Sequence, residues 1–373
     1  MIGDSEITSL INKVFIVDSL RYFIGPLSED TVPNQALETL RASETELPDM
    51  DTIMTNLILK DSSYRAQYIE TWEKTGVCIV HQTVGIVGQH QLAFERVVSD
   101  IAFWTRLSVI SQKIRIILHE KDILDVKRKR QLGVILGIQD AGFLSDRLHI
   151  LETLYNLGLR IIQPTYNIMN DFGTGCLERV DAGLSYQGIR LIKMINNLGM
   201  VIDASHCSWK TTMDILEVSK DPIIFSHVTC KAVYPHDRGK TDEELAAVAQ
   251  EGGYIGIALV PAFLASASHA TIKDFLKHLK HAIDVCGIDH VGIGTDWGAV
   301  YPKEIIIQEN KRAASAGFRP EHRLNFGCAV EGFKSWSDWP NIIRALTEEG
   351  YNLTNLRKIL GNNFLNVFKR VVK

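Results

Sequence analysis

The sequence predicts an α/β protein, and within that class a closed (β/α)8 TIM barrel. Three observations support this prediction: short apolar segments recur along the chain, segments with helical spacing alternate with them, and the 373 residues are 46% hydrophobic. Alternating strands and helices are typical of a parallel sheet covered by helices, and one barrel often reaches this length. We expect a single domain over residues 1–373; an open doubly wound sheet is the second choice.

The apolar segments are rich in Val and Ile and are bounded by Gly, Pro or polar residues. Their apolar residues are continuous rather than alternating, which is typical of strands buried on both faces. The eight predicted strands are 14–19, 75–85, 133–140, 159–167, 200–206, 222–228, 252–261 and 290–297.

The segments between these strands have helical spacing and recognisable ends. Asp242, Glu243 and Glu244 open one helix, and Gly199 and Gly287 follow the ends of two others. The long first connection, about 20–74, is predicted as an insertion over the barrel mouth with its own helical stretch near 50–74, and the tail at 338–371 predicts two further helices. The remaining predicted helices are 91–110, 144–157, 185–198, 208–219, 241–250 and 271–286.

The charge of the chain argues against a nucleic-acid partner. The formal net charge is −4 and the pI is near 6.3, whereas nucleic-acid binders usually concentrate basic residues on one face. The one short basic run, 127–130, is interpreted as a solvated loop or helix end, with a phosphate or membrane-surface contact as the alternative.

The sequence also predicts a cytoplasmic protein without a membrane span. The N-terminal MIGDSEITSL lacks the pattern of a signal peptide, and no window reaches the roughly 18 uninterrupted apolar residues that a span needs. The cysteines are scattered without CxxC pairs, which fits reduced thiols. They are Cys78, Cys176, Cys207, Cys230, Cys286 and Cys328.

Polar side chains repeatedly follow the predicted strands, where a barrel carries its catalytic groups. Burying such a group is unfavourable unless it is paired or bound to a ligand, so six polar strand ends indicate a functional site. They are Asp18, Gln139 with Asp140, Tyr166 with Asn167, Asp203 with His206, His227, and Asp296.

The most specific of these signals is the repeated Ser-His at His206 and His227. Two histidines at the ends of consecutive parallel strands would lie side by side, which suits two imidazole nitrogens on one metal ion. A hydrogen-bonded core histidine is the alternative for either residue alone. Cys207 is expected to point away from His206, because neighbouring residues of a strand face opposite sides.

Asp296 and Arg238 complete the predicted site. Asp296 follows the last strand and is interpreted as an acid/base or metal-binding carboxylate, with a helix cap as the alternative. Arg238 lies in the loop after His227 and would suit a planar carboxylate, with a solvated loop charge as the alternative. Phe326, Trp336, Trp297 and Tyr301 are interpreted as ordinary packing rather than as an aromatic pocket wall.

These motifs resemble the membrane (renal) dipeptidase family, the M19 peptidases of the amidohydrolase-like barrels. The resemblance extends from about residue 130 to the C-terminus and includes the region of the first strand. The matching stretches are LGLRIIQPTYN (157–167), ERVDAGLSYQG (178–188), NNLGMVIDASH (196–206), PIIFSHVTCKAVYPHDRG (222–239), GIDHVGIGTDWG (287–298) and RKILGNNFLNVF (357–368).

The resemblance implies a zinc dipeptidase with two metal ions. Carried over to this chain, it makes His206 and His227 ligands of the second ion. Asp296 becomes the catalytic aspartate, and Arg238 becomes the arginine that holds the substrate carboxylate.

The chain departs from the family pattern at the first ion. The positions of the His-x-Asp ligands are Leu20 and Tyr22, and the position of the bridging Glu is Gln139. Tyr166 stands where the family has the histidine that steadies the oxyanion. We read these departures as the loss of the first metal site in one branch of the family.

A binuclear centre is therefore not expected, because two divalent cations need an anionic bridge that a neutral amide cannot supply. One Zn²⁺ or other divalent ion could be held by His206, His227 and Asp296, with Gln139 as a weak candidate. Asp296 and Tyr166 would be catalytic, and Arg238, Tyr166 and Tyr22 would bind substrate.

Three hypotheses remain open at this point. The first is a metallohydrolase of the dipeptidase type that acts on a small amide bearing a carboxylate. The second is a metal-free lyase or isomerase acting on a small carboxylate in the same pocket, and the third is a non-catalytic pseudo-peptidase that binds a ligand or partner chain. The resemblance also implies that a homodimer is one arrangement for the chain.

Overall fold

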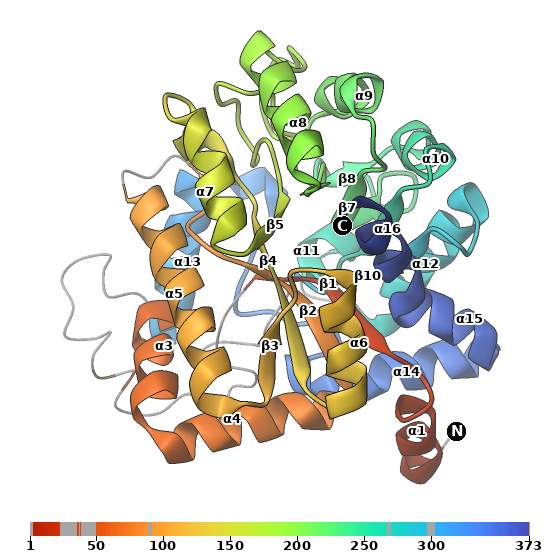
Figure 1. Ribbon diagram of the computed structural model, residues 1–373. Coiled ribbons are helices and arrows are strands. Elements are labelled where there is room, and N and C mark those ends of the chain that lie inside the picture. The colour runs from red at the N-terminus through yellow and green to blue at the C-terminus, as the bar shows by residue number, and fades with distance from the viewer. Residues whose placement is uncertain are drawn as a thin grey trace.

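The computed structural model describes residues 3–22, 36, 38, 50–88, 92–266, 270–296 and 303–372. In this part of the chain, eight parallel strands follow one another around a barrel (Figure 1), and each overlaps a predicted strand, which confirms the predicted fold class. They are β1 (Ile16–Arg21), β2 (Val77–Thr83), β4 (Leu132–Ile138), β5 (Leu159–Ile162), β6 (Val201–Ile202), β7 (Ile224–Cys230), β9 (Tyr254–Ile257) and β10 (Val291–Ile293).

Two seams close the barrel. Asp203, just after β6, bridges to Ile224 of β7, and the N–H of Ala204 donates to the Ile224 carbonyl. At the other seam the N–H of Asp296 donates to the carbonyl of Leu20, which joins the end of β10 to β1. Both seams therefore lie beside predicted site residues. The short strands β3 (Ile114–Ile116) and β8 (Gly239–Lys240), which were not predicted, pair with β4 and β7.

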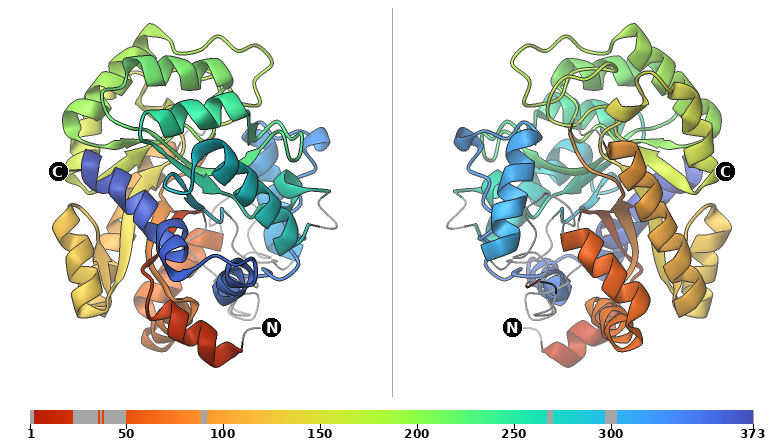
Figure 2. Two further views of the ribbon diagram at one scale, coloured as in Figure 1. Left: turned by 90° about the vertical axis from the view of Figure 1, so that its right-hand side faces the viewer. Right: turned by 90° about the vertical axis from the view of Figure 1, so that its left-hand side faces the viewer.

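Helices surround the strands, as Figures 1 and 2 show. Hydroxyl side chains cap several of them at the N-terminus, and Gly199 and Gly287 follow two of them with positive φ, as predicted. The helices that match predicted ones are α5 (Ala93–Ser111), α7 (Leu151–Asn156), α8 (Tyr186–Leu198), α9 (Trp209–Val218), α10 (Asp242–Gln250) and α12 (Ile272–Cys286).

Within the described residues, four α-helices were not predicted: α1 (Asp4–Ile11), α6 (Glu120–Lys129), α11 (Pro261–Leu264) and α13 (Lys303–Ser315). The basic run at 127–130 forms the last turn and C-cap of α6, which confirms its interpretation as a helix end. Basic side chains at this position interact favourably with the negative end of the helix dipole.

The first connection contributes α3 (Met50–Lys60) and α4 (Ser62–Thr75). Met50 and Met54 pack in one cluster with Val260 and Phe263, which follow β9 at the carboxyl end of the barrel. Most of residues 20–49 lie outside the described part of the chain.

The C-terminal segment closes the opposite end of the barrel. It forms α14 (Trp339–Glu348), α15 (Leu353–Arg357) and α16 (Asn363–Val371), where two helices were predicted. Phe364 and Phe368 of α16 pack with Val17, Ile135 and Tyr254, whose strands supply the apolar interior. Since α16 covers this end, access to the interior is left to the carboxyl end of the strands.

Two further observations concern the environment of the chain. No helix within the described residues is both long enough and apolar enough to cross a membrane. All six cysteines are free thiols, as predicted.

The buried carboxylate of Asp18 ties the first strand to the last one. It accepts hydrogen bonds from the N–H and hydroxyl of Thr295 and from the indole N–H of Trp336. Trp336 is buried and packs edge-on against Trp72, so its interpretation as packing is confirmed. Asp18 thus supports the β10–β1 seam from the side chain while Leu20 supports it from the backbone.

Replacing Asp18 by Asn should destabilise the fold. The new amide N–H₂ must face either the Trp336 indole N–H or the Thr295 N–H, and neither donor can become an acceptor, so one buried group loses its partner. We expect a loss of roughly 1–3 kcal/mol in the free energy of unfolding, measured by urea denaturation. Asp146→Asn, at an exposed aspartate, is the control, and equal stability of both variants would contradict this role of Asp18.

Candidate active site

The two Ser-His motifs meet at one buried carboxylate. Asp203 accepts hydrogen bonds from the N–H and the hydroxyl of Ser205, and from the N–H and the hydroxyl of Ser226. Sequence reasoning noted Asp203 as a polar strand end but gave it no role. Its role could have been inferred from two features of the sequence: a serine precedes each histidine, and an aspartate lies two residues before the first serine. Asp203 fixes the two motifs relative to each other.

This network sets the tautomer of His227. The hydroxyl of Ser226 donates its one hydrogen bond to Asp203. Its oxygen can therefore only accept from the Nδ1–H of His227, at 2.7 Å. The Nε2 atom of His227 therefore carries a lone pair.

His206 is held in the same tautomer by Asn167. The Nδ2 group of Asn167 donates to the carbonyl of Ala316, which turns its Oδ1 atom toward His206. The Nδ1–H of His206 donates to that Oδ1 atom at 2.7 Å. Nε2 of His206 is again left with a lone pair.

The two Nε2 atoms lie 2.9 Å apart and face each other. Burial, and secondly the charge of Arg238, hold the pKa of both histidines well below the usual value, so both rings are neutral at pH 7. Two lone pairs at this distance repel each other unless a cation lies between them. Neutral imidazole nitrogens are ligands that Zn²⁺ accepts readily, so the pair fits one divalent ion.

Arg238 lies beside this pair and is almost fully buried. It donates to the carbonyls of Ser205 and His227, and its NH2 atom lies 3.4 Å from Nε2 of His206. Its Nε atom has no hydrogen-bond partner among the described residues. Arg238 thus places a fixed positive charge next to the histidines, and two of its five N–H groups are bound to backbone carbonyls.

Asp296 faces the pair from the β10 side. Its Oδ2 atom lies 3.9 Å from Nε2 of His227. Burial raises the pKa of Asp296 to about 7, although the charge of Arg238 opposes the rise. Asp296 also has a φ of 51°, in the left-handed region that Asp and Asn tolerate better than most residues.

Tyr166 covers the other side of the site. Its ring stacks on His206 with centroids 3.9 Å apart. Burial raises the pKa of its phenol well above the usual value, so the hydroxyl remains a hydrogen-bond donor.

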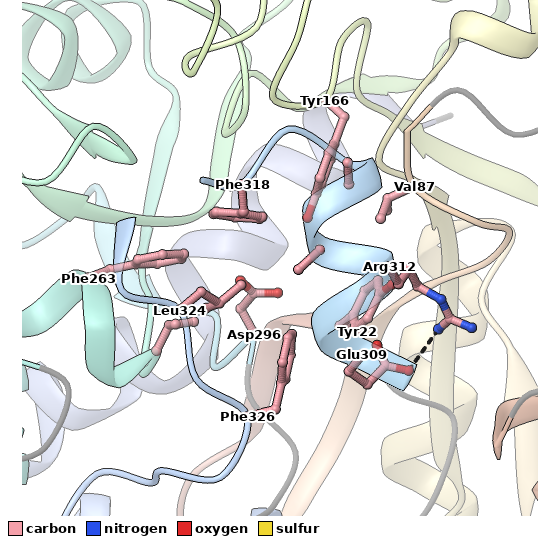
Figure 3. Close-up of a pocket in the computed structure, with 13 residues that line it drawn as sticks. Tyr22, Val87, Tyr166, Phe263, Asp296, Glu309, Arg312, Phe318, Leu324 and Phe326 are labelled. Atoms are coloured by element: carbon pink, nitrogen blue, oxygen red, sulfur yellow. Dashed lines mark hydrogen bonds and ion pairs between the residues drawn. The ribbon is translucent and has the colours of Figure 1, made fainter. Parts of the chain in front are cut away.

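Of these side chains, Asp296 and Tyr166 line a pocket of about 460 Å³, its mouth included. Figure 3 shows Asp296 with Phe263 and Phe318 on one side and with Tyr22, Glu309 and Arg312 on the other. The described lining residues are Tyr22, Val87, Tyr166, Val260, Phe263, Asp296, Glu309, Arg312, Ala313, Ala316, Phe318, Leu324 and Phe326.

The positions assigned to a first ion offer no ionised ligand. Leu20 is fully buried and apolar, and burial raises the pKa of the Tyr22 phenol. Gln139 donates its amide N–H to Thr83 and its Oε1 atom has no partner among the described residues. Asp140 accepts from Gly142 N–H and from Asn170, so it holds a loop. This donor set does not fit a second divalent ion.

The predicted site residues thus fall into two groups. His206, His227, Asp296, Arg238 and Tyr166 gather at one place. Tyr22 lies on the pocket wall, and Gln139 is held by Thr83 on the neighbouring strand. Phe326 lines the pocket, so its interpretation as ordinary packing is wrong, while Trp297 and Tyr301 lie outside the described residues.

Comparison with known proteins identifies the family of the chain. The model of the membrane dipeptidase family (peptidase family M19) matches residues 6–306. Dipeptidase tcpJ of Claviceps purpurea is 26% identical over 269 residues, which cover 71% of this chain and 57% of that protein. The chain thus spans little more than half the length of that relative.

Two solved structures share the fold over almost the full length of both chains. An amidohydrolase from Pseudomonas aeruginosa has a TM-score of 0.79 at 25% identity, covering 98% of this chain and 99% of that one. A metallopeptidase from Rhodobacter sphaeroides, liganded with a phosphinate mimic of the dipeptide L-Ala-D-Ala, has a TM-score of 0.68 at 18% identity, covering 96% and 99%. With the family match over most of its length, this chain belongs to the membrane dipeptidase family, peptidase family M19.

Proposed function

We propose that the chain hydrolyses a small amide or dipeptide-like substrate with a carboxylate and uses a single divalent metal ion held by His206 and His227. We further propose that it acts in the cytoplasm, which its free thiols support. The dipeptidase name of the Claviceps relative and the dipeptide mimic bound to the Rhodobacter structure support the substrate class.

The observation that carries the proposal is the pair of facing Nε2 atoms. Asn167 and Ser226 hold both rings so that their lone pairs converge, which is the usual arrangement around metal-binding histidines. A divalent ion bound there would supply an activated water and polarise the amide carbonyl. Within the described residues no group of three or more His, Cys, Asp or Glu side chains is assembled to hold an ion. Water would therefore fill most of the remaining coordination positions, and Asp296, whose Oδ2 atom lies 3.9 Å from Nε2 of His227, would have to move closer to become a third protein ligand.

Side chains of the protein would transfer the proton and stabilise the oxyanion. Asp296 faces the histidines and opens into the pocket, so it can accept a proton from the attacking water and deliver it to the leaving amine. A pKa near 7 suits a group that must both take up and release a proton near neutral pH. Tyr166 lines the same pocket and keeps its proton, so it can donate to the developing oxyanion.

A metal-free acid/base reaction is the second candidate, and one observation favours it. The guanidinium of Arg238 lies 3.4 Å from Nε2 of His206, where it can donate to the lone pair that a metal would need. In that case the histidines and Asp296 would act as acid and base on a small carboxylate. Activity that survives exhaustive chelation would favour this candidate over the first.

Metal analysis tests the first proposal. We expect about one Zn²⁺ per chain in protein analysed by inductively coupled plasma mass spectrometry, because the first-ion positions lack a bridging anion. His206→Ala and His227→Ala should each weaken binding by more than the roughly 10- to 100-fold seen for outer-shell changes. His149→Ala, at an exposed histidine, should keep full affinity. Two ions per chain, or full binding by both site variants, would refute the proposal.

Asp296→Asn tests the proton transfer. Asn tolerates the left-handed backbone as Asp does, so the fold should be kept while the proton acceptor is lost. We expect kcat for dipeptide hydrolysis to fall by roughly 10²–10⁴-fold, with an unchanged thermal midpoint. An active Asp296→Asn enzyme would remove Asp296 from the reaction.

Tyr166→Phe tests the oxyanion role separately. The phenyl ring can still stack on His206, but its donor is gone. We expect kcat to fall by roughly 100-fold while bound metal stays constant. A change in KM alone would instead indicate that Tyr166 contributes only to ground-state binding.

A further inference from the structure

The pocket above Asp296 has one half built almost entirely of apolar side chains. This half, here called the aromatic pocket, comprises Val260, Phe263, Phe318, Leu324 and Phe326. Its residues come from α11, from the segment just before it, and from the segment after α13. It begins beside Asp296, so a substrate with its scissile bond at that carboxylate reaches into it (Figure 3).

The wall of the aromatic pocket is backed by other rings. Phe263 and Phe318 lie nearly parallel, with centroids 6.0 Å apart and an interplanar angle of 14°. Behind them His236 packs on Phe263 and His322 packs edge-on against Phe318. His236 and His322 are joined in turn by a hydrogen bond from Nε2 of His236 to the His322 carbonyl. The wall is therefore preformed, as is usual for small-molecule pockets.

The charges in the other half of the pocket already have partners. Glu309 is almost fully buried and forms an ion pair with Arg312 at 3.0 Å. Arg312 also donates a hydrogen bond to the side chain of Tyr22. Tyr22 stands at one of the positions that the resemblance assigns to the first ion, so these charged groups lie next to that position. Because these charged groups already have partners and lie in the other half, they would not attract a charged substrate side chain into the aromatic pocket.

We propose that the aromatic pocket selects substrates by an uncharged, bulky apolar side chain next to the scissile amide. The inference rests on the proposed hydrolytic function and adds the substrate class. An apolar side chain would be transferred from water into contact with three phenyl rings, which is favourable in proportion to the area buried. A Lys or Glu side chain would lose its hydration there without gaining a partner among the described lining residues.

A series of dipeptide phosphinate mimics separates this inference from the proposed function, because binding needs no turnover. We expect mimics with Phe or Leu side chains to bind the intact protein roughly 10- to 100-fold more tightly than the Gly analogue, and those with Lys or Glu to bind no better than Gly. Isothermal titration calorimetry measures the affinities. Equal binding across the series, or preferred binding of a charged side chain, would overturn the inference, whereas no binding by any mimic would refute the proposed function on which it rests.

Substitutions in the wall of the aromatic pocket test whether these residues cause the preference for apolar side chains. Phe318→Ala and Phe326→Ala should each reduce the preference for Phe over Gly by roughly 10-fold, while Phe318→Leu should keep most of it. Leu157→Ala, which truncates an exposed leucine at the end of α7, is the matched control. If a Phe→Ala variant fails to fold by its thermal midpoint, Phe318→Leu and the Leu324→Ala variant still test the wall. A preference unchanged in all folded wall variants would contradict the assignment.

Discussion

Asp203 is the group on which the geometry of the site depends. It accepts four hydrogen bonds from two serines that precede the two histidines, and it lies at the seam where β6 meets β7. Because Asp203 accepts the hydrogen bond of the Ser226 hydroxyl, the Ser226 oxygen can only accept from Nδ1–H of His227. The β6–β7 seam and the tautomer of His227 are therefore both supported by one fully buried carboxylate, while Asn167 orients the His206 ring toward His227.

The charges of the side chains around the site explain why one divalent ion fits and two do not. Two divalent cations a few ångströms apart require an anion between them. The chain instead presents hydrocarbon at Leu20, a protonated phenol at Tyr22 and an amide at Gln139. The buried guanidinium of Arg238 already contributes one positive charge beside the histidines. The nearby anionic groups, Asp296 and Asp203, can balance that charge and a single ion more readily than they could balance a pair.

The barrel could be predicted because its strands are continuous apolar runs, and the pairing of His206 with His227 because Ser-His recurs at consecutive strand ends. Helix α6 was missed because it is largely charged and buries only Ile123 and Val126. The hydrogen bonds of Arg238 to backbone carbonyls were not predictable, since they depend on where two strands end relative to a distant loop. The aromatic pocket was missed for the same reason: Phe263 and Phe318 are far apart in sequence and meet only across the barrel mouth.

The β10–β1 seam shows how the first-ion ligands can be absent while the fold is kept. On the β1 side the seam uses the carbonyl of Leu20, the carboxylate of Asp18 and the hydroxyl of Ser19, which donates to the carbonyls of Ser226 and Ile293. None of these contacts involves the side chain of Leu20 or Tyr22. Substitutions at those two positions therefore leave barrel closure intact, and with it the left-handed backbone that presents Asp296 to the pocket. The hydrolase fold and the second-ion histidines can persist because the residues that close the barrel differ from those that would bind the first ion.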